Sequence, residues 1–144
     1  MKSSVDQLNS FLRGEIAAVE TYRMALAKIE EMDATHDQLI TNLHSHEDRV
    51  GILEEAIRAI GGEPATSSGP WGVFVRSIEG GAQLFGRRAT LAVLEEGEDH
   101  GLVDYREDLD DDELDAGTKR VVRDTLLPAQ QLTHDSLSGL RKRL

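Results

Sequence analysis

Apolar residues recur along this chain in alternating steps of three and four, the spacing that places them on one face of an α-helix. The first apolar stripe predicts a helix over residues 4–32, which begins at a capping box formed by Ser4 and Gln7. The second stripe predicts a helix over residues 36–60, because Gly61 and Gly62 favour a left-handed stop and Pro64 prevents continuation. The short break between these helices predicts an antiparallel hairpin.

A second hairpin is expected after a long connection. Residues 61–82 are first rich in Gly, Pro and Ser and then apolar and aromatic, which predicts a crossover with a short broken helix. Two further stripes predict helices over residues 83–109 and 116–143, the latter capped by Asp115 and kinked near Pro128. The predicted fold is all-α, with residues 1–144 forming one four-helix bundle of two antiparallel hairpins joined by a single crossover.

The amino-acid composition limits which classes of protein and which kinds of binding partner are expected. The chain has no Cys, which excludes disulfides and thiolate metal sites, and no apolar run of about 18 residues that would span a membrane. Its net charge of −11 resides in residues 95–115, which hold twelve acids and one base and leave the remainder neutral. With no basic stripe for nucleic acid, we expect a cytoplasmic protein without a nucleic-acid or membrane partner.

Several polar side chains interrupt the apolar stripes and are therefore expected to point inward. The residues concerned are Glu15, Tyr22, His46, Arg88, Glu95, Glu98 and Tyr105, with Gln131 and His134 beside the fourth stripe. Buried carboxylates destabilise a fold unless a cation or a hydrogen-bond network compensates them. A divalent metal is one such cation, and the candidate ligands are Glu15, His46, Glu95, Glu98 and His134. Folding the first hairpin back on itself places His46 opposite Tyr22 and about two turns from Glu15.

A short repeat relates the first and third helices: Glu15 precedes Tyr22 by seven residues, as Glu98 precedes Tyr105. With the Gly-Gly-Glu-Pro sequence at residues 61–64 and segments 94–102 and 127–134, this repeat resembles the ferritin-like superfamily. The chain looks closest to a family of small bacterial ferritin-like proteins of unknown function. The resemblance implies a ferritin-like bundle with a candidate di-iron centre and a role in metal handling or stress protection.

Two departures from the ferritin-like pattern lower the charge available to hold iron. Val50 stands where a Glu-x-x-His motif starting at Glu47 would have His, and Gln131 is an amide where a carboxylate is expected. The ligand set of a di-iron oxidase is thus incomplete, and a weaker or single-metal site remains as one interpretation.

The alternative interpretation is a metal-free bundle that acts as a structural or protein-interaction module. In it, Arg88, Tyr22, Tyr105 and His46 compensate the inward carboxylates. Residues 108–115 form a solvated acidic face or, in a third interpretation, bind a basic partner. The aromatic crossover residues Trp71, Phe74 and Phe85 either cover the bundle or form a homodimer contact.

Overall fold

The computed structural model describes residues 3–29, 34–72, 75, 86–112 and 114–143, and within these ranges the chain is helical with no strand. The elements are α1 (Ser4–Lys28), α2 (Ala34–Ala59), the 3₁₀ turn η1 (Gly69–Trp71), α4 (Gly86–Leu109), α5 (Ala116–Val121), the π-helical turn η2 (Val122–Leu126) and α6 (Leu127–Lys142). The all-α prediction is confirmed. The predicted helix ends at residues 30–32 and 83–85 lie outside the described residues.

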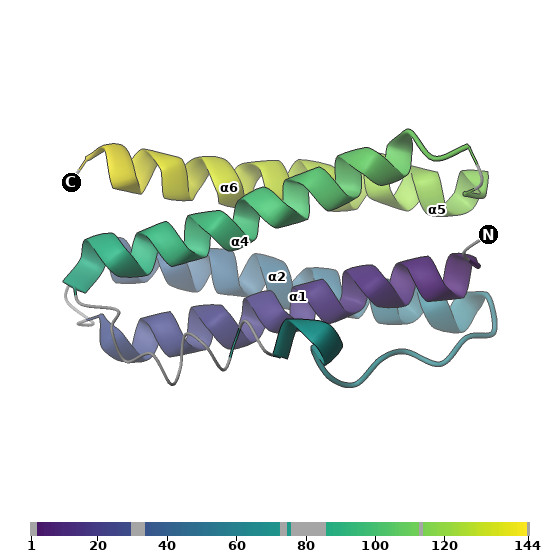
Figure 1. The fold of residues 1–144 in the computed structure, drawn as a ribbon, viewed down its shortest axis with the longest axis horizontal. Helices are drawn as coiled ribbons and strands as arrows, with labels where there is room; N and C mark the ends of the chain where they lie inside the picture. Colours follow the sequence, from purple (N-terminus) through teal and green to yellow (C-terminus); the bar gives the residue numbers. More distant parts are fainter. Residues whose placement is uncertain (1–2, 30–33, 73–74, 76–85, 113, 144) are drawn as a thin grey trace.

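The helices form two antiparallel pairs that lie side by side (Figure 1). α1 packs along α2, and α4 packs along α6, while α4 also contacts α1 across the bundle. α2 ends at the opposite end of the bundle from the start of α4 (Figure 1). Within this connection η1 lies against α1. The four helical segments thus surround one interior.

Local hydrogen bonds explain where the first hairpin begins and ends. Ser3, rather than Ser4, is the N-cap of α1 and accepts from the backbone N–H of Asp6 at 3.1 Å. At the end of α2, Gly62 donates to the Ile57 carbonyl at 2.9 Å. Gly61 has a φ of 82°, a left-handed conformation that suits glycine. The predicted glycine stop is confirmed.

The fourth helical segment is continuous but irregular before Pro128. The Leu127 N–H donates to the Val122 carbonyl, five residues back, which defines the π-helical turn. Proline has no N–H to donate and its ring would clash with the carbonyl four residues earlier, here that of Asp124. The wider turn accommodates this defect and rotates the residues that follow. Leu132 in this segment is 73% exposed.

The apolar core is divided into two clusters, with polar residues between them. One cluster comprises Leu8, Phe11, Leu12, Leu53, Ile57, Tyr105, Val122 and Leu126. The other comprises Tyr22, Ala25, Ile29, Leu39, Leu91, Leu94, Leu137 and Leu140. Among the described residues, no helix combines the length and the apolar content needed to cross a membrane.

Candidate functional site

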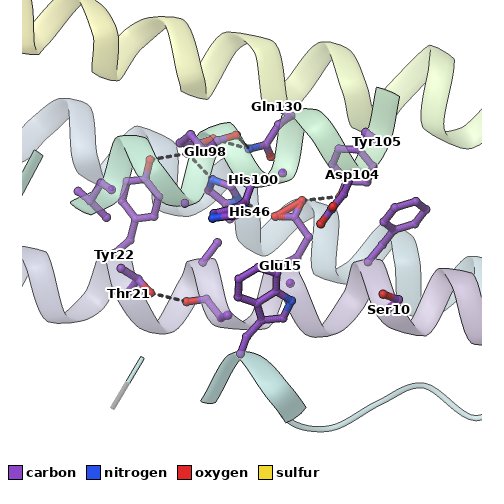
Figure 2. Close-up of a pocket in the computed structure, with 18 of the residues that line it drawn as sticks. Ser10, Glu15, Thr21, Tyr22, His46, Glu98, His100, Asp104, Tyr105 and Gln130 are labelled. Carbon is purple, nitrogen blue, oxygen red and sulfur yellow. Dashed lines mark hydrogen bonds and ion pairs between the residues drawn. The ribbon is translucent and has the colours of Figure 1, made fainter. Parts of the chain in front are cut away.

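Three side chains predicted to point inward meet in the polar centre of the bundle. Glu15 on α1, His46 on α2 and Glu98 on α4 are each no more than 4% exposed. The His46 ring lies between the carboxylates, with Nδ1 2.5 Å from Glu15 Oε1 and Nε2 2.8 Å from Glu98 Oε2. Figure 2 shows this arrangement, in which one imidazole links two helices from opposite hairpins.

Each tyrosine of the repeat contacts the glutamate of the other helix. Tyr22 donates its hydroxyl to Glu98 Oε2 at 2.6 Å, and Tyr105 donates to Glu15 Oε2 at 2.8 Å. Seven residues is two helical turns, about 10.5 Å, so each tyrosine lies level with the glutamate of the other helix. The repeat is explained by this exchange, which joins α1 to α4.

Arg49 supplies a second buried cation. Its side chain is 1% exposed, and Nη1 lies 3.3 Å from Glu15 Oε2. The guanidinium also donates to the side chains of Gln130, Thr133 and Ser45, the last two at 3.1 Å. Arg49 therefore connects α2 to α6 as well as neutralising Glu15.

Helix α6 contributes neutral donors to Glu98. Gln130 Nε2 and Thr133 Oγ1 each donate to Glu98 Oε1 at 2.7 Å. Gln130 Nε2 also lies 2.9 Å from the Glu98 backbone carbonyl. Glycine at position 101 permits this approach, because a Cβ there would lie 2.5 Å from Gln130 Nε2. We call Glu15, Tyr22, His46, Arg49, Glu98, Tyr105, Gln130 and Thr133 the core network.

The core network favours charged carboxylates and a charged imidazole. Burial by itself would raise the pKa of Glu15, but Arg49 and His46 outweigh it and lower that pKa below 4.5. Burial by itself would also raise the pKa of Glu98, but His46 and the hydroxyl groups that donate to Glu98 outweigh it and lower that pKa. For His46, burial lowers the pKa, but the two carboxylates outweigh it and raise the pKa above 6.5. The arrangement thus favours two anions facing two cations in the interior.

The other two candidate ligands lie outside the core network. Glu95 is half-buried and pairs with Arg141 at 3.1 Å. His134 contacts Asp99 at 2.6 Å and Asp135 at 3.2 Å. The structure thus brings together three of the five candidate residues, and it places no group of three or more His, Asp or Glu suited to a metal ion among the residues it describes. The expected inward position of Arg88 is wrong, because that side chain is exposed.

Sequence reasoning missed the members of the core network that lie beside the predicted stripes. Arg49 follows His46 by three residues and precedes buried Leu53 by four, so it lies on the same face of α2. Gln130 and Thr133 continue the spacing of Val122 and Leu126 through the π-helical turn. The sequence contains these spacings, but a polar residue at such a position is usually expected to face solvent. The predicted two-turn gap between Glu15 and His46 was also wrong, since their side chains are in contact.

A pocket of about 70 Å³ lies between α1 and α4. This volume corresponds to space for on the order of five water molecules. Its lining includes Glu15, His46 and Glu98 of the core network, together with Trp71 from η1 and exposed His100. The rings of Trp71 and His100 meet edge to face with centroids 5.6 Å apart. Because exposed residues line it, the pocket connects the core network to the surface.

No protein-family model, curated protein or solved structure matches this chain.

Proposed function

We propose that this chain is a metal-independent bundle of ferritin-like topology that works as a binding module. The observation that carries the proposal is the charge balance of the core network, in which His46 and Arg49 lie where cations are needed by Glu15 and Glu98. A carboxylate that already has a protein cation and several donors has little to gain from a metal ion. The interior is therefore complete without an inorganic centre.

The geometry around His46 also disfavours a metal. An imidazole ligates through a deprotonated nitrogen, but both nitrogens of His46 face carboxylate oxygens and its pKa is raised above 6.5. The ring keeps Glu15 and Glu98 on opposite sides, whereas in a two-metal bundle centre carboxylates bridge the ions. The residues present do not fit such a centre.

Binding is proposed rather than catalysis because the same contacts engage the reactive groups. A histidine that holds its proton between two carboxylates is a poor general base at neutral pH. The core network joins both hairpins and thereby maintains the pocket between α1 and α4. We infer that its role is to keep this pocket in shape.

A weak iron site at Glu15, His46 and Glu98 is the second candidate, since these side chains do meet at one point in the interior. It requires His46 to lose its proton and Glu15 to release Arg49. In this candidate the chain would act in metal handling or stress protection.

Metal content distinguishes the two candidates. The protein is purified from iron-replete medium, incubated with Fe(II), Mn(II) or Zn(II), desalted, and analysed for metal per chain and for melting temperature. We expect negligible metal and no rise in melting temperature. Stoichiometric metal that is lost in Glu98→Gln but retained in the control His134→Ala would overturn the metal-independent proposal, because His134 lies outside the core network.

A further inference from the structure

The pocket between α1 and α4 exists because small residues line both helices. Gly14, Ala17 and Ala18 contribute from α1, and Gly97 and Gly101 contribute from α4. A Cβ at Gly97 would have no atom within 4 Å, so the space beside it is open. The pocket has the volume of a small organic molecule rather than of a lone ion.

Aromatic side chains make up much of the pocket wall. All the aromatic residues that the structure describes line it, namely Phe11, Tyr22, Trp71 and Tyr105. The rings of Phe11 and Tyr105 are in contact, with centroids 4.8 Å apart. Aromatic faces carry a negative quadrupole and attract cations, most strongly where water is excluded.

The pocket is lined by three carboxylates and by His46, which lies between two of them. Glu15 and Glu98 contribute to its lining from the interior, and exposed Asp104 contributes from α4 (Figure 2). Arg49, which neutralises Glu15, does not itself line the pocket. The chain as a whole carries −11, so its field attracts cations and repels anions.

The hydrogen bonds of the core network restrict which cation is suited to the pocket. A carboxylate offers about four lone-pair sites. The partners of Glu15 are His46, Tyr105 and Arg49, and the partners of Glu98 are His46, Tyr22, Gln130 and Thr133. These contacts use all four sites of Glu98 and three of those of Glu15, which leaves few acceptors for a primary ammonium, whereas a methylated ammonium needs only charge and apolar contact.

We propose that the pocket binds a small organic cation with a methylated ammonium group, held against the aromatic wall and attracted by the net negative charge of the lining and of the chain as a whole. This inference rests on the binding role proposed above. The cation adds to the interior without displacing His46 or Arg49, so the core network stays intact.

Trp71 gives a direct test, because it is the single Trp of the chain and lines the pocket. Tetramethylammonium chloride is titrated into the full chain at constant ionic strength, with EDTA present, while Trp fluorescence is recorded. The same titration is made with tert-butanol, a neutral molecule of similar shape, and with methylammonium chloride. We expect saturable binding of tetramethylammonium, roughly tenfold tighter than that of either comparison compound.

Matched leucine substitutions locate the binding. Gly97→Leu fills the pocket from α4 and should weaken tetramethylammonium binding by roughly tenfold or more. Gly51→Leu on α2 is the control, since a Cβ there also meets no atom within 4 Å and Gly51 does not line the pocket. Absent saturation, equal binding of tert-butanol, or equal loss in both variants would overturn the inference. Because EDTA is present, none of these outcomes depends on whether the protein binds metal.

Discussion

Replacing Arg49 by Met tests the charge balance of the interior directly. Methionine keeps an unbranched side chain of comparable length but removes the guanidinium that lies 3.3 Å from Glu15. It also removes donors to Gln130 and Thr133, which lie on α6. The substitution therefore leaves a buried carboxylate with one cation fewer and removes some of the hydrogen bonds between α2 and α6.

The expected loss of stability can be worked from the structure. Without Arg49, Glu15 either remains charged at a Coulombic cost or takes up a proton. Protonation at about pH 7 costs roughly 3 kcal/mol relative to an unfolded chain in which its pKa is near 4.5. The lost hydrogen bonds contribute on the order of 1 kcal/mol more. Arg49→Met should thus lower the unfolding free energy by about 3–5 kcal/mol, the range for breaking a buried ion pair.

Urea unfolding followed by circular dichroism measures this loss, and the melting temperature should fall by roughly 10–20 °C. The matched control is Arg23→Met, which breaks an ion pair between Arg23 and Glu47. The side chains of these two residues are 62% and 39% exposed, respectively. That change should cost less than about 1 kcal/mol. The double variant Glu15→Gln with Arg49→Met should recover part of the lost stability, since it removes the uncompensated charge.

The pH dependence separates charge from packing. Glu15 in the Arg49→Met protein can become neutral cheaply in acid, so the difference from the unmodified chain should narrow by roughly 2–3 kcal/mol between about pH 7 and about pH 5. A difference that is small at neutral pH, or that stays constant across this interval, would refute the view that Arg49 is retained to neutralise Glu15.

Three further predictions concern the core network. The pKa of His46 is raised above 6.5 in the fold, so the stability that His46 adds should be complete below about pH 6.5 and should fall as the pH rises through the folded pKa. The pKa values of Glu15 and Glu98 are lowered, so the stability that these carboxylates add should be lost only below about pH 4.5. Chemical unfolding of the unmodified chain and His46→Gln across this range tests it, and a constant difference above about pH 6.5 would show that His46 is neutral. Tyr22→Phe removes the 2.6 Å bond to Glu98 and should cost about 1.5–3 kcal/mol by urea unfolding, a loss that an unchanged midpoint would contradict. Gly101→Ala places a Cβ against Gln130 and should lower the melting temperature. The control Gly139→Ala adds a Cβ that meets no atom within 4 Å and should raise the melting temperature slightly. A higher melting temperature for Gly101→Ala than for Gly139→Ala would argue against the Gln130 contact.

The helices and their buried faces were predictable because helical spacing is a local property. The stripe through Glu15 and Tyr22 on α1, and that through Glu98 and Tyr105 on α4, place all four side chains in the interior. The seven-residue repeat also indicated that they act as a set. Their crosswise pairing was not readable, since it depends on how far one helix slides along the other.

The identity of the compensating cation was decided only by tertiary structure. Arg88 and Arg49 both lie near the predicted stripes, but Arg49 enters the interior because Glu15 and the side chains of α6 offer it partners there. A long flexible side chain takes its direction from what it meets across the bundle, which spacing along one helix does not encode. The sequence determined that Glu15 and Glu98 are buried, and the packing of four helical segments determined that His46 and Arg49 lie beside them.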